Sequence, residues 1–194
     1  MVRVEIAAYL YIFYLIVWHS RLCISNRMYD VIVTRVTCED YNSSIVYNVS
    51  CTTRNLNRTT KAYSLSGYIF PNISLNAIFV RITFHQRINT GYRRLIADSE
   101  ENFCAFRNGT SKSLVMSILW PFLKAHSNLD HKCPFSGFIY VSDFIIRFDN
   151  FPPALPEGEG RVMIHLRNGP QRASLIKVGV YGEIKPKGAA SLKF

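Results

Sequence analysis

The chain has 194 residues, enough for one domain with a single hydrophobic core, and 48% of them are hydrophobic. Its 23 Lys and Arg exceed its 13 Asp and Glu, which gives a formal net charge of +10. No apolar run reaches the roughly 20 residues that a spanning helix needs, so we do not expect a membrane-spanning protein.

The first 25 residues predict a cleaved secretory signal peptide. After the short basic start Met1-Val2-Arg3, residues 6–18 are an unbroken apolar run, which fits the hydrophobic region of a signal. Cys23-Ile24-Ser25 is the expected cleavage tripeptide, with Ser20 as an alternative. A buried helix or a signal anchor is the competing interpretation. We expect residues 26–194 to form a single secreted, extracellular domain.

Glycosylation motifs support the same compartment. The chain contains more Asn-x-Ser/Thr sequons than chance would give, and we expect N-glycosylation at these sites. The sequon asparagines are Asn42, Asn48, Asn57, Asn72 and Asn108.

The cysteines also indicate an oxidising compartment. One of the five, Cys23, lies in the predicted signal, which leaves the even set Cys38, Cys51, Cys104 and Cys133. Four cysteines allow three pairings, and the sequence does not choose among them. Local spacing favours Cys38–Cys51 and Cys104–Cys133. In a secreted chain, the scattered positive charge suggests acidic partners such as lipid head groups, glycans or receptors, and not nucleic acid.

The chain after residue 25 reads mostly as β-strands. Weaker patterns predict strands over 29–38, 45–51 and 62–70. Strict alternation over 78–85 predicts a strand whose apolar face carries Ile78, Val80, Ile82 and Phe84. Asn89-Thr90-Gly91 predicts the following turn.

One segment has helical spacing instead. Thr110 or Ser111 can cap a helix in which Val115, Ile118, Leu119 and Phe122 share one side. Pro121 should kink or end it. We therefore expect a short helix near 111–125.

Alternation returns over residues 138–148, 161–167 and 175–184. In the first of these segments the apolar face is expected to carry Phe138, Tyr140, Phe144 and Ile146. Roughly eight strands with one short helix predict an all-β fold, an antiparallel two-sheet sandwich.

The sequence carries no catalytic, metal or cofactor signature. It has no G-x-S-x-G motif, and Gly158-Glu159-Gly160 is not a nucleotide-binding loop. His126, His131 and Cys133 could be drawn as a metal site, but zinc sites usually bring cysteines in close pairs. We therefore expect no cofactor, no metal and no enzymatic activity.

Aromatic residues are abundant, with 13 Phe and 11 Tyr, many of them on predicted inner faces. This pattern is compatible with an ordinary solid core or with sheets that leave an apolar cavity for an acyl chain. Periodicity cannot separate the two, because a cavity wall and a packed core use the same residues.

Several motifs from Asn102 onward form a pattern of their own. They are Phe103-Cys104, the apolar helix, the block Ser127-Asn128-Leu129-Asp130-His131-Lys132-Cys133-Pro134, the stretch Leu155-Pro156-Glu157-Gly158-Glu159-Gly160, and Val178-Gly179-Val180-Tyr181. Upstream, Cys51 is followed by Asn57-Arg58. In this combination the chain resembles the insect secreted domain of unknown function 1091 family, allied to the CheB-type chemosensory proteins. It departs from that family at Gly160, where an aromatic residue is typical.

The resemblance implies an immunoglobulin-like sandwich of the ML (MD-2-related lipid-recognition) type, without a settled activity or firm binding residues. Our first hypothesis is a non-enzymatic extracellular carrier or presenter of a small hydrophobic ligand, a lipid or pheromone, in a chemosensory setting. The expected cavity lining is Ile78, Val80, Ile82, Phe84, Val115, Ile118, Phe122, Phe138, Tyr140, Phe144 and Ile146. The alternative is a secreted glycoprotein module with a solid core that binds a receptor or an acidic glycan through its basic surface.

Overall fold

The computed structural model describes residues 29–57, 60–146 and 155–187. The predicted signal peptide lies outside these ranges. The described strands are β1 (Tyr29–Tyr41), β2 (Val46–Asn55), β3 (Lys61–Ile69), β4 (Ile78–Ile88), β5 (Gly91–Asn102), β6 (Phe138–Phe144), β7 (Gly158–Asn168) and β8 (Ala173–Pro186); the helices are α2 (Phe103–Arg107) and α3 (Leu114–His126).

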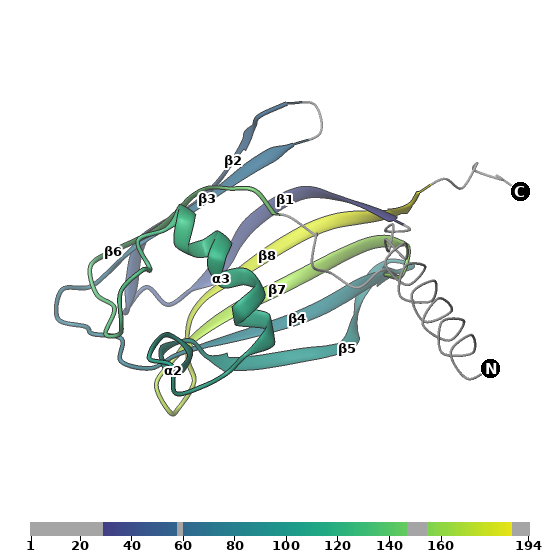
Figure 1. The fold of residues 1–194 in the computed structure, drawn as a ribbon. Coiled ribbons are helices and arrows are strands. Elements are labelled where there is room, and N and C mark those ends of the chain that lie inside the picture. Colours follow the sequence, from purple (N-terminus) through teal and green to yellow (C-terminus); the bar gives the residue numbers. More distant parts are fainter. Residues whose placement is uncertain (1–28, 58–59, 147–154, 188–194) are drawn as a thin grey trace, which may run out of the picture.

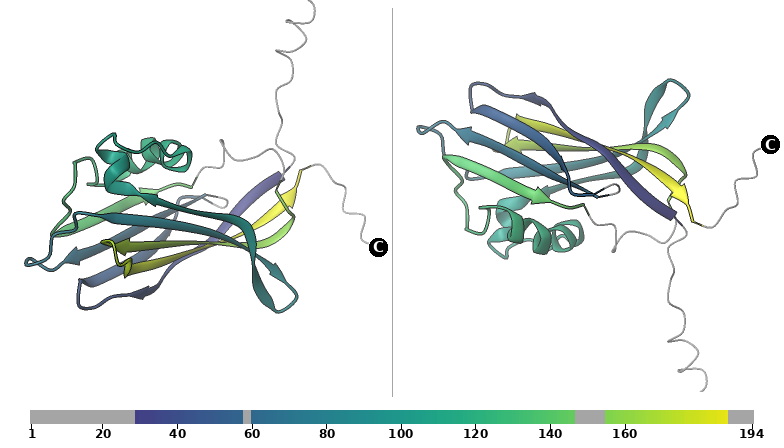
Figure 2. Two further views of the ribbon diagram at one scale, coloured as in Figure 1. Left: turned by 90° about the horizontal axis from the view of Figure 1, so that it is seen from below. Right: turned by 90° about the horizontal axis from the view of Figure 1, so that it is seen from above.

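The strands form two antiparallel sheets, which confirms the predicted all-β sandwich. The five-stranded sheet has the order β1-β8-β7-β4-β5, and the three-stranded sheet has the order β2-β3-β6. In Figures 1 and 2, α3 lies over the same face of the five-stranded sheet as the three-stranded sheet does, beside β6. The helix and the smaller sheet together make the second layer of the sandwich.

The inner face of the five-stranded sheet is built in rows, because residues paired across antiparallel strands point to the same side. Ile82 of β4 pairs with Ile164 of β7, which pairs with Val178 of β8. The predicted apolar face of β4 is confirmed: Ile78, Val80 and Ile82 are buried in the core and Phe84 packs against it.

The two layers are tied together at their β1 edge. The disulfide Cys38–Cys51 joins β1 to β2, and the buried Tyr63 of β3 donates its hydroxyl to the carbonyl of Val33 in β1 at 3.1 Å. Burial raises the pKa of the Tyr63 phenol to about 12, because a phenolate would be poorly solvated there.

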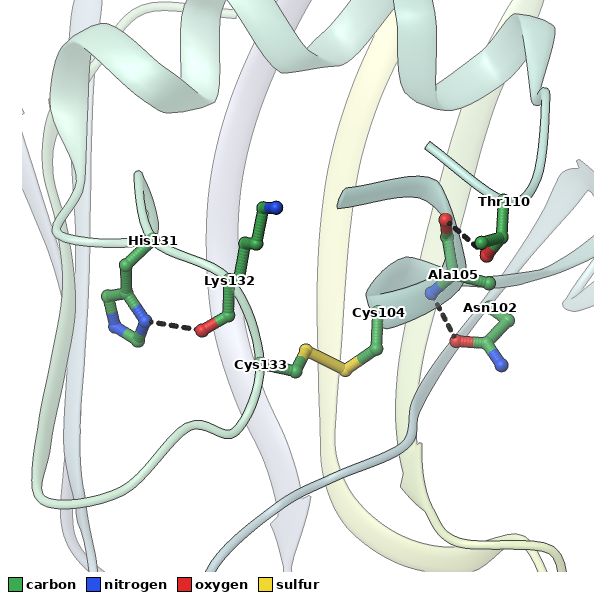
Figure 3. The surroundings of a disulfide bond; sticks show 7 residues. All are labelled: Asn102, Cys104, Ala105, Thr110, His131, Lys132 and Cys133. Atoms are coloured by element: carbon green, nitrogen blue, oxygen red, sulfur yellow. Dashed lines mark hydrogen bonds between the residues drawn. A yellow bond between two sulfur atoms is a disulfide. The ribbon is translucent and has the colours of Figure 1, made fainter. Parts of the chain in front are cut away.

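The second disulfide, Cys104–Cys133, joins α2 to the loop before β6 (Figure 3). Both pairings therefore agree with the spacing prediction. The short helix α2 was not predicted. It begins because the Asn102 side chain accepts a hydrogen bond from the Ala105 amide at 2.9 Å, which satisfies one of the free amides of the first turn.

The predicted longer helix exists, with shifted bounds. Its cap is Ser113, whose hydroxyl accepts from the Met116 amide at 3.2 Å, rather than Thr110 or Ser111. Pro121 lies inside α3, and the helix continues past it to His126. None of the described helices is long and apolar enough to cross a membrane.

Candidate functional site

The candidate site is the inner face of the five-stranded sheet beneath α3. Its floor consists of Phe84 of β4, Val162 and Ile164 of β7, and Val178 and Val180 of β8, which stand side by side in the strand register. All these side chains are apolar, so covering the floor with other apolar groups is favoured by the hydrophobic effect.

Burial is uneven across this floor. The inward residues Ile82 of β4 and Val178 of β8 are only 6% exposed. Ile164, between them on the central strand β7, is only partly buried, as are Val162 and Leu166. In a close-packed interior the central strand should be covered best. Ile164 instead keeps some exposure between two buried neighbours.

The helix above this floor is also loosely packed. Met116 is the buried residue of α3. Val115, Leu119 and Trp120 are partly buried and pack against the core, and Ile118 and Phe122 are partly buried as well. An apolar helix face that keeps this much exposure can accept additional apolar contacts.

The middle of α3 and the segment after it are nevertheless held in place. Midway along the helix, the Arg107 guanidinium of α2 lies 3.8 Å from the centre of the Trp120 ring. After its end, the Asn128 amide donates to the carbonyl of Phe138 at 2.7 Å and accepts from the amide of Tyr140 at 3.0 Å. These two contacts position the helix over the sheet.

Polar atoms border the floor at the edge strand β5. Ser99 and Glu101 are paired with Ile82 and Val80, and so point to the inner side. The Ser99 hydroxyl donates to Glu101 Oε1 at 3.2 Å. An apolar surface with a few polar groups at its margin is the usual composition of a site for a hydrophobic ligand with a polar end.

The structure corrects the predicted lining on β6. Phe138 and Tyr140 lie on the outer face of the three-stranded sheet, where the Phe138 ring is 4.7 Å from Tyr68 and 5.7 Å from Tyr140. Phe138 is 43% exposed. The inner positions of this strand belong to Ile139, which packs against the core, and to Val141.

The other predicted lining residue within β6 behaves differently. Phe144 contacts the ring of His126 at the end of α3, with 6.1 Å between ring centres. Asp143 has a positive φ of 49° next to the register shift in this strand, and this irregularity returns Phe144 to the helix side. Ile146 is partly buried beyond the end of β6.

The structure thus gathers the predicted lining residues of β4 and α3 and leaves out Phe138 and Tyr140. The sequence reasoning missed the contribution of β7, whose inward residues are Val162, Ile164 and Leu166. Their alternation was visible in the sequence, but only the strand order reveals that β7 is central in its sheet.

The histidine and cysteine alternative is not supported. Cys133 is in a disulfide, so it offers no thiolate. His126 Nδ1 lies 3.1 Å from the carbonyl of Ser142, and His131 Nδ1 lies 2.8 Å from that of Lys132, so each ring is occupied with local backbone. Among the described residues, no group of acidic, histidine and cysteine side chains is arranged to hold a metal ion.

The sequon asparagines lie outside the strands that form the floor. Asn48, Asn57, Asn72 and Asn108 are exposed and Asn42 is partly buried. Asn42 and Asn48 lie near the β1–β2 turn, Asn57 follows β2, and Asn108 follows α2.

Residues 80–162 match the family model described as a protein of unknown function, DUF1091. The resemblance to that family is confirmed. The DUF1091 match runs from β4 through α2, α3 and β6 into β7, so it contains α3 and much of the floor beneath it. No curated protein matches the chain.

Among solved structures, the chain is similar to the crystal structure of chicken MD-1 complexed with lipid IVa. The identity is 11% and the TM-score is 0.38, and the alignment covers 84% of this chain and 99% of that one.

Proposed function

We propose that the protein is a non-enzymatic, extracellular carrier or presenter of a small hydrophobic ligand, whose apolar chain enters between α3 and the five-stranded sheet. The observation that carries the proposal is the incomplete burial of Val162, Ile164 and Leu166 on the central strand. A ligand chain above β7 would remove these side chains from water.

The free energy gained by burying an apolar ligand chain is large enough to support binding. Each buried CH₂ group contributes about 0.8 kcal/mol, so an acyl or hydrocarbon chain of ordinary length could bind through contacts with the floor and α3 alone. Ser99 and Glu101 would meet a hydroxyl or amine at the polar end of the ligand. A lipid or pheromone with one apolar chain has this composition.

The cysteines support the proposed extracellular compartment. Two disulfides are typical of oxidising compartments, in which thiols are not kept reduced. Together with the predicted signal peptide and sequons, they support secretion as a glycoprotein. A chemosensory role is part of the proposal and rests on the family resemblance.

A variant that fills the space tests the proposal. Ile164→Trp adds a large apolar side chain at the centre of the floor and should reduce binding of a fluorescent fatty acid at least tenfold. Ile118→Trp fills the space from the α3 side and should do the same. Ile88→Trp is the matched control, because Ile88 is 41% exposed at the end of β4 and its replacement should leave binding unchanged.

The native protein gives a second test. Purified from a secreting eukaryotic host, the protein should yield a co-purifying lipid on solvent extraction and mass spectrometry, and Ile164→Trp should yield less. The proposal is wrong if neither the native extract nor the fluorescent probe shows binding, or if the Ile88→Trp control loses binding equally.

A further inference from the structure

The opposite face of the five-stranded sheet has a different character. In Figure 2 the helices and the three-stranded sheet lie on one side of this sheet, and no described element covers the other side. The residues that alternate with the apolar floor point to this outer side. On β4 they are Phe79, Arg81, Thr83 and His85, and on β7 they are Arg161, Met163, His165 and Arg167.

A shallow pocket of about 260 Å³ lies on this outer face. Seven side chains from four adjacent strands line it: Arg81, Thr83, His85, Arg94, Met163, His165 and Lys177. Three of these side chains, Arg81, Arg94 and Lys177, are positively charged at physiological pH. The volume is below the usual 300 to 1,000 Å³ range for small-molecule sites, so the pocket suits one functional group of a larger ligand.

The pocket has an excess of positive charge. Arg81 and Arg94 share one carboxylate, that of Asp98, which Arg81 contacts through two nitrogens at 2.9 and 2.6 Å. Lys177 pairs with Asp40 at 2.9 Å. Beside the pocket, Arg161 forms no ion pair with any described residue.

Arg161 is instead held by aromatic rings. Its guanidinium carbon lies 4.9 Å from the centre of the Tyr92 ring and 5.9 Å from that of Tyr181, at distances typical of cation–π contacts. Its Nε is buried without a hydrogen-bond partner, and so is Nδ1 of the neighbouring His85. Buried polar groups left without partners cost free energy, and an anion in or beside the pocket could satisfy them.

Burial and the neighbouring cations lower the pKa of both histidines in the pocket lining. Burial and the nearby Arg161 and Arg94 lower the pKa of His85. Burial together with Lys177 and Arg81 lowers the pKa of His165. Both imidazoles are therefore neutral at physiological pH, and the surrounding cations repel any further positive charge.

The outer face also carries no sequon. The sequons precede β4 or follow α2, and none falls on β4, β5, β7 or β8. Glycans attached to this chain would leave the pocket open. Large exposed apolar side chains are absent from its lining, although a membrane-surface site would need them to insert among lipids.

We propose that this pocket binds a sulfate or carboxylate group of an acidic polysaccharide. Arg94 and Lys177 contact the acidic group, and the exposed Arg87, two positions beyond His85 on the same face of β4, extends the attraction to a further group of the same polymer. This site is independent of the hydrophobic site, because it lies on the other side of the sheet.

The test measures binding of the secreted protein to immobilised heparin over a range of ionic strengths. The double variant Arg94→Gln/Lys177→Gln should weaken binding at least tenfold and reduce its salt dependence, because charge contacts are screened by salt. The matched control is Arg54→Gln/Lys124→Gln, which removes the same charge from surface ion pairs with Asp143 and Asp130. The control should bind within about twofold of the wild type.

Circular dichroism and thermal unfolding establish that both double variants remain folded. An equal loss of binding in the two variants would refute the pocket, since it would show that total charge alone decides. Binding to vesicles of anionic phospholipid but not to heparin would overturn the polysaccharide assignment. So would inorganic sulfate binding as tightly as the polymer.

Discussion

Replacement of Phe135 by alanine is the sharpest test of how the second layer is held over the sheet. Phe135 is 1% exposed. Its ring lies 5.8 Å from that of Phe103 and 4.5 Å from that of His131. Its backbone exchanges two hydrogen bonds with Leu75, at 2.8 and 3.1 Å. The substitution removes the ring and leaves these backbone bonds possible.

The expected loss is large. A buried Phe→Ala change costs about 3 to 5 kcal/mol, because transfer free energy and cavity formation add together. For a domain of this size that loss corresponds to a fall in Tm of roughly 10 °C. The matched control is Phe138→Ala, three positions further along the chain, where the ring is 43% exposed. It should cost about 1 kcal/mol, mainly from the aromatic contacts with Tyr68 and Tyr140.

The assay is urea unfolding, followed by far-ultraviolet circular dichroism and by tryptophan fluorescence. Trp120 reports directly on this region because its ring lies 5.9 Å from that of Phe103. The reasoning is refuted if Phe135→Ala loses less than about 1 kcal/mol, or if Phe138→Ala loses as much as Phe135→Ala.

Three further predictions concern the ties between elements and the response to pH. Replacing Cys104 and Cys133 by alanine should cost about 3.6 kcal/mol in denaturant unfolding, from the chain entropy released by opening a loop with a sequence separation of 29; an unchanged midpoint would contradict this. Tyr63→Phe should cost about 1 kcal/mol by leaving the Val33 carbonyl unpaired, and ultraviolet titration of the wild type should show one tyrosine that ionises only near pH 12. Because the pKa of His165 is lowered in the folded protein, the unfolded chain takes up a proton on this imidazole first as the pH falls. The contribution of His165 to the free energy of unfolding is therefore complete above about pH 6.5 and declines below it. His165→Gln should lose less stability than the wild type between about pH 7.5 and pH 5.5, and an equal or larger loss would contradict the assignment.

Local patterns were enough to predict the strands whose two faces differ in polarity. On β4 the apolar residues Ile78, Val80 and Ile82 alternate with polar ones, so the strand and its inner face could both be predicted. The disulfide pairs were also within reach of local reasoning, because each closes a short loop.

The face of β6 could not be read in the same way. Both of its faces are apolar, since Ile139 and Val141 alternate with Phe138 and Tyr140. Periodicity then gives no preference, and the bulky aromatic residues are wrongly predicted to be the inner ones. The contact with Tyr68 across the sheet decides the matter, and such a contact between distant segments is not visible in the sequence.

The pocket on the outer face was beyond prediction for a related reason. Arg81, Arg94 and Lys177 are far apart in the chain and look like ordinary surface charges. They meet because β8 and β7 pair beside β4, and because β5 folds back on β4 through the turn after Ile88. The strand order therefore creates the local excess of charge.

The central strand β7 contributes to both proposed sites through alternate residues. Ile164 points to the apolar floor, whereas its neighbours Met163 and His165 line the basic pocket. Because successive side chains leave a strand on opposite faces, filling the space beneath α3 through Ile164→Trp should leave heparin binding intact. Likewise, Arg94→Gln/Lys177→Gln should leave binding of the fluorescent fatty acid intact. A variant of either face that abolished both kinds of binding would show that the sheet itself had been disturbed, and would contradict the assignment of the two ligands to separate faces. Independent loss of the two activities is the result expected of a protein that holds a hydrophobic ligand on one face of a sheet and an acidic matrix on the other.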